Sequence, residues 1–278
     1  MTNNNQIAGG AAPAVYQCRL PLSRQTITRV AGMLRAHLKA IGSRWRKLPP
    51  GRIAILVLAH LRHDQRLADL AGGNGVSAPA IRRWVLEVIG LLARRAPRLQ
   101  RALNTISAAG GDAVLLDGTL VRTRRRTGTQ NRRNYSGKHK AHGLLFLALT
   151  DEHGNLLWIS AAQPGRSSEI TTARRNRITA RLREAGPGAL AGLGFTGLDD
   201  RPEDAPVIIT GMKATRTTKL TSAQKKASAL LSPERAAAEH GFADLKNWRI
   251  LTRLRMDARH ATRLLRALLV LTSLEITH

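Results

Sequence analysis

The sequence predicts an α/β protein in which a layered sheet domain follows a small all-α domain. Over roughly the first hundred residues, apolar side chains recur at helical spacing. Beyond Gly111, short apolar runs bounded by glycine and polar turns predict strands instead. Strand-like and helical segments then alternate toward the C-terminus, as they do in α/β layers. The 278 residues are enough for one large domain or two smaller ones with a sizeable core.

Changes of pattern divide the chain into three expected parts: a disordered leader at residues 1–20, a helical domain at 21–105 and a sheet domain at 111–278. The small-residue segment Ser107–Gly111 marks the boundary between the two domains. Ser23 has the position of an N-cap for a first amphipathic helix. The segment Ile53–Leu61 is apolar on all sides, which predicts a buried second helix.

Residues 64–95 have the pattern of a helix-turn-helix motif. A short helix from Asp64 to Ala71 leads into a glycine-rich turn, and Ser77 caps a second helix. That second helix carries Arg82, Arg83 and Trp84 near its start, where base edges are read in the major groove. An ordinary helical hairpin is the alternative. The charge of the chain favours DNA, so we expect Ser77, Arg82 and Arg83 to contact it.

The sheet domain is predicted from apolar runs and the turns between them. Strands are expected at Asp112–Val121, His142–Thr150, Leu156–Ala161, within Gly188–Phe195, and at Pro206–Thr210 with Val207, Ile208 and Ile209 buried. The polar turn at residues 151–155 makes the early strands antiparallel. Helices are expected from Ser167 or Ser168 to about Arg183, at Leu220–Leu231, at Pro233–Leu251 and at Ala258–Leu274.

The charge of the chain points to a polyanionic partner. Lys and Arg number 45 against 18 Asp and Glu, which gives a formal net charge of +27. Nucleic acid is the expected partner, and a membrane surface is the lesser alternative because the cations are spread along the whole chain. The single cysteine, Cys18, excludes a disulfide framework and a cysteine-rich zinc site. With no secretory signal and no membrane-spanning run, we expect a cytoplasmic protein.

The first candidate site is the carboxylate of Asp117, which ends the apolar run Ala113–Leu116. A dense basic segment follows it: Arg122, Arg124, Arg125, Arg126, Arg132, Arg133, Lys138 and Lys140. A carboxylate that faces many cations suggests that a metal ion is held beside a polyanion. The alternative is an aspartate in a turn beside a solvated basic loop, and these residues alone leave both interpretations open.

The second candidate is the helix that contains Glu239. Phe242 and Leu245 have the spacing of buried residues, with Trp248 a further candidate. Glu239 and Lys246 are two turns apart and therefore share a face. Such a pair could complete a metal site and hold the adjacent phosphate, although taken alone it is more typical of an exposed helix with ordinary charges.

Several strings in this order resemble DDE-type transposases of bacterial insertion sequences. They are Leu116-Asp-Gly-Thr, Tyr135-Ser-Gly-Lys-His-Lys-Ala-His-Gly143, Pro164-Gly-Arg, Gly211-Met-Lys-Ala-Thr-Arg216 and Glu239-His-Gly-Phe-Ala-Asp-Leu-Lys-Asn-Trp-Arg-Ile-Leu251. The resemblance covers roughly residues 20–277. It implies a ribonuclease-H-like mixed sheet with flanking helices, preceded by the helix-turn-helix domain.

The resemblance also implies chemistry. Asp117 matches the family's first carboxylate and Glu239 its third, and both would hold divalent cations, with Mg²⁺ expected. The implied reaction is cleavage at the element's ends followed by strand transfer. The implied partners are double-stranded DNA of the terminal repeats and the target, with a homo-oligomer assembled on it. We expect these cations to bind DNA: Arg124, Arg125, Arg132, Lys138, Lys140 and Lys246.

The family's second carboxylate is missing. Where the family usually reads Asp-Leu-Gly-aromatic, this chain reads Gly192-Leu-Gly-Phe195. The histidine-aspartate pair that usually follows Pro-Gly is replaced by Ser168-Glu169. Substitute carboxylates are Glu169, Asp199 and Asp200. The resemblance therefore leaves two hypotheses, a transposase with impaired chemistry and a catalytically inactive DNA-binding regulator derived from one.

Overall fold

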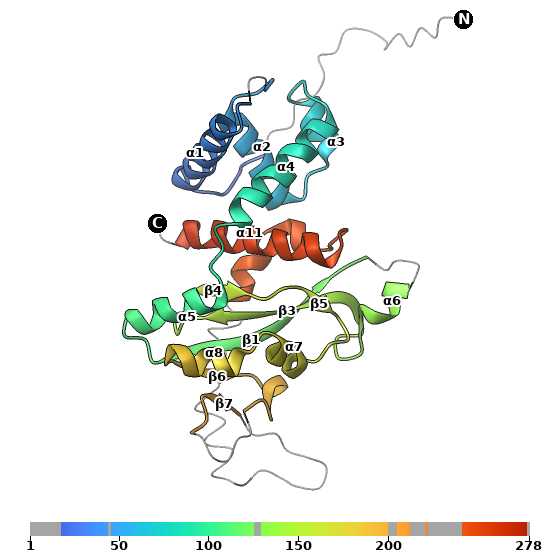
Figure 1. Ribbon diagram of the computed structural model, residues 1–278. Helices are drawn as coiled ribbons and strands as arrows, with labels where there is room; N and C mark the ends of the chain where they lie inside the picture. The colour runs from blue at the N-terminus through green and yellow to red at the C-terminus, as the bar shows by residue number, and fades with distance from the viewer. Residues whose placement is uncertain are drawn as a thin grey trace, which may run out of the picture.

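The computed structural model describes residues 18–43, 46–124, 129–199, 205–211, 221 and 241–276 (Figure 1). Most of the predicted leader lies outside these residues, as do Arg125, Asp200 and Glu239. The first elements are α1 (Arg24–Ala40), α2 (Pro50–His63), α3 (Leu67–Gly72), α4 (Ala78–Ala93) and α5 (Leu99–Ala108). Ser23 caps α1 as predicted, because its side chain accepts a hydrogen bond of 3.1 Å from the Thr26 N–H.

The helix-turn-helix segment differs from the prediction at its start. Asp64 does not begin α3 but ends α2, with left-handed backbone at φ 53° and ψ 35°. A left-handed residue cannot continue a right-handed helix, so α3 begins only at Leu67. Ser77 caps α4 as predicted, with its side chain accepting from the Ala80 N–H.

The sheet contains β1 (Ala113–Arg122), β2 (Tyr135–Ser136), β3 (Ala141–Thr150), β4 (Leu156–Ile159), β5 (Gln163–Pro164), β6 (Gly188–Ala191) and β7 (Ile208–Thr210). β3 pairs antiparallel with β1, and β2, β4 and β5 pair antiparallel with β3. On the other side of β1, β6 and then β7 run parallel to it. This mixed sheet with its covering helices is the ribonuclease-H-like architecture that the resemblance implies.

The remaining elements are α6 (Thr129–Arg133), α7 (Glu169–Arg175), α8 (Ile178–Ala185), η1 (Leu193–Phe195), η2 (Arg249–Leu251) and α11 (Ala258–Ile276). The predicted single helix that ends near Arg183 is wrong. Arg177 has a φ of 53°, which breaks it into α7 and α8. The predicted burial of Ile209 is also wrong: this residue is 50% exposed, because alternate residues of β7 face away from the core.

Side-chain alternation along β1 separates two apolar cores. Val114 and Leu116 point to a core that includes residues of α5, α7, α8 and β6. Val121 points to the opposite core, which includes residues 242–254 and α11. Trp248 lies in this second core at 1% exposure and donates its indole N–H to the Thr272 hydroxyl at 3.1 Å. The predicted inward packing of Phe242, Leu245 and Trp248 is thus confirmed.

The C-terminal helix α11 joins the helical part to the sheet. In Figure 1 it lies between the upper helices and the strands, and its apolar residues belong to one core with those of α1, α2 and α4. Glu275 near its end accepts hydrogen bonds from the Ser23 N–H and hydroxyl at about 3.1 Å. The guanidinium of Arg62 lies 5.5 Å from the Trp248 ring centroid. The predicted domain boundary at 105–111 stays a prediction, and α5 packs on the sheet core.

Candidate active site and nucleic-acid interface

Asp117 lies in β1, where the strand leaves its partner β6. The last residues paired there are Leu116 and Ala191. Asp117 is half-buried. Because side chains alternate along a strand, it shares a face with Val121 and therefore faces the side of the sheet that residues 242–254 cover. Asp117 stays paired with Ala148 of β3, so its carboxylate is held by rigid strand backbone, as the sequence predicts.

Gly192 is the residue directly after β6, and it adjoins Asp117. A Cβ built on Gly192 would lie 3.9 Å from the Asp117 Oδ1 atom. The backbone of Gly192 is extended, with φ −67° and ψ 165°, so an ordinary side chain fits there without strain. An aspartate at this position would therefore place a second carboxyl group beside the first. In this chain the position carries no side chain.

Glu169 is the first candidate substitute, and it lies on the other face of β1. A Cβ built on Gly118 would meet the Glu169 Cγ at 2.9 Å, and one built on Gly194 would fall on the Glu169 carboxylate. Because Gly118 and Asp117 are neighbours in a strand, their side-chain positions point to opposite faces. Glu169 is also engaged elsewhere, since its Oε1 atom lies 2.9 Å from the Lys138 Nζ.

Asp199, the second candidate substitute, is a structural carboxylate. Its side chain is 3% exposed and pairs with Arg183 at 2.8 Å. Its other oxygen accepts the N–H groups of Val207 and Ile208 at 2.8 and 3.3 Å. These contacts connect the segment after η1 to the start of β7. Both carboxylate oxygens of Asp199 are therefore engaged in structural contacts. Asp200, the third candidate, lies outside the described residues.

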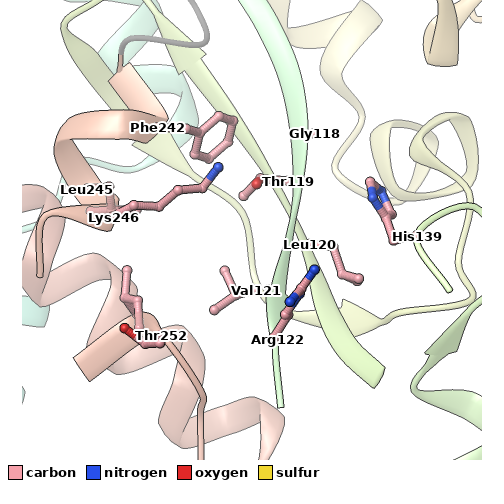
Figure 2. Close-up of a pocket in the computed structure, with 11 residues that line it drawn as sticks. Gly118, Thr119, Leu120, Val121, Arg122, His139, Phe242, Leu245, Lys246 and Thr252 are labelled. Atoms are coloured by element: carbon pink, nitrogen blue, oxygen red, sulfur yellow. The ribbon is translucent and has the colours of Figure 1, made fainter. Parts of the chain in front are cut away.

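A pocket of about 440 Å³ opens along β1 next to Asp117 (Figure 2). Its lining combines the strand with the segment that follows Glu239: Gly118, Thr119, Leu120, Val121, Arg122, His139, Phe242, Leu245, Lys246, Leu251 and Thr252. Figure 2 shows Lys246 and Phe242 on one side of the strand and His139 on the other. The structure thus brings the predicted DNA contact Lys246 to the strand that carries Asp117.

A second basic pocket, of about 540 Å³, lies at the far end of β1. It is lined by Arg122, Thr123, Arg124, Lys140, Ala141, His142 and Arg253. The predicted contacts Arg124 and Lys140 are therefore brought together. Sequence reasoning missed Arg253, which comes close because the Leu254 N–H donates to the Arg122 carbonyl at 2.8 Å. The available signal is the recurrence of arginine at residues 249, 253 and 255, across the end of the predicted helix.

The other predicted DNA contacts are spread over the surface. Arg82 and Arg83 are exposed on α4, whereas Trp84, expected beside them, is 4% exposed and packs in the core. Trp84 points inward because it shares a helix face with the buried Ile81 and Val88. Arg132 is exposed on α6, and Lys138 is exposed but paired with Glu169. Arg125 lies outside the described residues.

The described residues supply only part of a two-metal site. Among them, no group of three His, Cys, Asp or Glu side chains is placed to hold a metal ion. Asp117 is the one predicted ligand that the structure describes, since Glu239 lies outside it and Gly192 offers no side chain. Two cations need several anionic oxygens to hold them, so the described residues do not fit two divalent ions. None of the described helices is long and apolar enough to cross a membrane.

Comparisons with known proteins agree with this geometry. A family model described as DDE superfamily endonuclease matches residues 116–273. A second, described as helix-turn-helix of DDE superfamily endonuclease, matches residues 46–98. No curated protein matches the chain. Among solved structures, a crystal structure of a pre-cleavage Mos1 transpososome aligns at 12% identity over 91% of this chain and 96% of that chain. Its TM-score of 0.18 is too low to support a fold argument.

Proposed function

The chain belongs to the DDE superfamily of endonucleases, the DDE-type transposases, and on this premise we propose that it binds insertion-sequence ends but cleaves and transfers DNA strands poorly. The helix-turn-helix match indicates DNA binding, and members of this superfamily use divalent metal ions. In the proposal the resident ion is Mg²⁺ and its ligands are Asp117 and Glu239. The impairment comes from Gly192, which stands where a second aspartate is expected.

The observation that carries the proposal is the pair of positions Asp117 and Gly192. Their 3.9 Å separation, measured from the Asp117 Oδ1 to a built Cβ, is that of two groups that would share a cation. Neither described substitute carboxylate takes the place of the missing aspartate. Asp199 is bound to Arg183, and Glu169 lies on the opposite face of β1. The family's metal ions supply charge stabilisation at the scissile phosphate. A site that lacks one anionic ligand holds them weakly.

The proposed DNA contacts divide into two groups. Ser77, Arg82 and Arg83 at the start of α4 contact the terminal repeats, which is where a recognition helix reads base edges. The cations near β1 hold the phosphate backbone beside the carboxylates: Arg124, Arg125, Arg132, Lys138, Lys140 and Lys246. The proposal includes a homo-oligomer on the paired ends, with the helix-turn-helix of one copy on each end.

The test restores the missing group. We expect Gly192→Asp to cleave a terminal-repeat duplex at least about 100-fold faster than the unmodified protein, because metal ligation contributes several kcal/mol at the transition state. Gly192→Asn is the matched control, since it adds the same bulk without the charge, and Glu239→Ala in the Gly192→Asp background should abolish the gain. Mn²⁺ titration followed by electron paramagnetic resonance should show tighter binding only for Gly192→Asp. Efficient cleavage by the unmodified protein, unchanged by Gly192→Asp, would refute the impairment.

A DNA-binding regulator is the second candidate function. The exposed Arg82 and Arg83 on a capped α4 favour it, because this surface keeps its cations while the carboxylate position at Gly192 is lost. A copy that occupies element ends without cutting would compete with an active relative. A gel-shift titration should then show end-specific complexes, and adding the protein to an active transposase should lower cleavage. Absence of any end-specific complex would exclude this function.

A further inference from the structure

A third pocket, of about 430 Å³, lies where the helical part meets the sheet. It is lined by Ala96, Pro97, Arg98, Leu99, Gln100, Trp158, Asn176, Arg181 and Arg266. Its walls thus come from the loop after α4, the start of α5, strand β4, helices α7–α8 and α11. β4 lies on the far side of β3 from β1, so the pocket is separate from the strand that carries Asp117.

The lining of this pocket is cationic. Arg98, Arg181 and Arg266 line it, and no acidic residue does. Arg181 is partly neutralised at the rim, where its guanidinium donates to Glu184 at 2.9 Å and to Gln100 at 3.3 Å. Glu184 is 59% exposed, so this ion pair is screened by water and weak. The pocket therefore keeps most of its positive charge.

Arg266 is the most informative of the three arginines. It is half-buried on α11, and burial lowers the pKa of its guanidinium. Within the described part of the chain, no carboxylate pairs with it and no hydrogen bond is made by its side chain. A desolvated cation without a counter-charge costs folding free energy. A bound ligand that carries a negative charge would compensate the charge of Arg266.

The start of α5 adds hydrogen-bond donors to the same pocket. Arg98 is the N-cap of α5, and no side chain caps the first turn. Leu99 and Gln100 of that turn line the pocket. The first N–H groups of a helix have no partner within it and carry partial positive charge. Together with the arginines, they form a setting suited to a phosphate group.

We propose that this pocket binds a backbone phosphate of duplex DNA that runs from α4 across the domain junction. The loop between α4 and α5 supports a DNA source, because Arg94 and Arg95 are exposed and precede Arg98 along it. These cations lead along the chain from the end of α4 to Arg98 at the pocket. The contact is independent of Gly192 and of cleavage, and it positions DNA along the edge of the sheet opposite β6 and β7.

The test uses the full-length protein and a duplex of random sequence, so that it does not depend on cleavage or on end recognition. Arg266→Met should lower affinity several-fold and reduce the steepness of the log affinity versus log salt plot by about 0.9, the value for one phosphate contact. Arg263→Met is the matched control, because Arg263 is exposed on the same helix and does not line the pocket. It should change the slope much less.

Two further measurements distinguish a DNA contact from a purely structural arginine and from a site for free phosphate. In the absence of DNA, the melting temperature of Arg266→Met should be equal to or above that of the unmodified protein, whereas a purely structural arginine would lower it when removed. Inorganic phosphate at constant ionic strength tests a free anion as the source. If phosphate raises the melting temperature of the unmodified protein but the salt slope does not change, the site binds free phosphate and not DNA. If Arg266→Met changes neither the affinity for DNA nor the salt slope, the proposal is wrong.

Discussion

The surface of α4 and the end of β6 are the places to which the proposed function assigns DNA binding and cleavage, and we expect them to differ in their tolerance to sequence change. On α4 and directly after it, Arg82, Arg83, Arg94 and Arg95 are exposed, and each would contribute a fraction of the attraction to a polyanion. At the end of β6, by contrast, a single position adjoins Asp117. That position is Gly192, which has no carboxylate. A distributed interaction survives the loss of one member, whereas a metal site of few ligands does not. Binding and cleavage can therefore be lost separately in one chain.

The helical part and one face of the sheet share a core, and the largest expected effect would disturb both at once. Trp248 is 1% exposed and packs in the core that unites α2, α4 and α11 with the sheet. We expect Trp248→Ala to lower the free energy of unfolding by about 3–5 kcal/mol, because it leaves a large cavity. Chemical denaturation should show it. Trp248→Phe, which keeps most of the bulk, should lose distinctly less.

The same experiment tests whether the halves unfold together. If they form one cooperative unit, far-ultraviolet circular dichroism and tryptophan fluorescence, to which Trp84 of the helical part and Trp158 of the sheet both contribute, should report a single transition. Two separate transitions in the Trp248→Ala variant would show that the helical part is stable without the sheet.

Asp199 tests the comparison further. The sequence suggests it as a substitute metal ligand, whereas in the structure it holds Arg183 and the backbone at the start of β7. We expect Asp199→Asn to lower the free energy of unfolding by about 3 kcal/mol, since it leaves Arg183 without its partner and disturbs two backbone hydrogen bonds. Glu184→Gln is the control, as its exposed pair with Arg181 should matter by less than about 0.5 kcal/mol. If Asp199→Asn instead abolishes cleavage in a stably folded Gly192→Asp protein, Asp199 is a ligand after all.

The sequence predicts the secondary structure well where local signals agree with tertiary packing. The Ser23 and Ser77 caps follow from a serine at the start of a helical pattern, and the inward packing of Trp248 follows from helical spacing. It fails where one residue has unusual backbone, as at Arg177, whose positive φ divides a predicted helix without any glycine or proline to signal it. It also fails at Ile209, because the face of β7 that carries Ile208 packs in the core and Ile209 faces away from it.

The candidate site shows the same limit. The absence of a second carboxylate at Gly192 is visible from the string that surrounds it. The sequence does not reveal that Glu169 lies on the opposite face of β1 from Asp117. Its place depends on how α7 packs against Gly118 and Gly194. The approach of Arg253 to Arg124 likewise depends on a bridge between Leu254 and Thr123, the residue directly after β1. Contacts between residues that are far apart along the chain leave no local pattern in a single sequence.

The next prediction concerns the tolerant region, where a single change should weaken binding without abolishing it. We expect Arg83→Ala to reduce affinity for the terminal repeat by about 1–3 kcal/mol, as for loss of one base or phosphate contact. Arg29→Ala is the control, because Arg29 is exposed on α1, away from the proposed reading helix. Fluorescence anisotropy with repeat and scrambled duplexes would measure both. An equal loss for Arg29→Ala would mean that only net charge matters and that α4 does not read the repeat.

The smallest expected effect concerns Ser77, where two substitutions should change the stability of α4 and its affinity for DNA in opposite directions. Ser77 accepts a hydrogen bond from the Ala80 N–H at 3.4 Å, a long bond at an exposed helix start. Ser77→Ala should therefore lower the free energy of unfolding by about 0.5–1 kcal/mol, whereas Ser77→Asp should keep the cap. The two variants differ for DNA, because an aspartate at this position places a negative charge where the phosphate backbone would approach the helix N-terminus. Ser77→Asp should thus bind DNA more weakly than Ser77→Ala while being more stable. If the more stable variant also binds better, the start of α4 does not face DNA, and the recognition surface must lie on another helix.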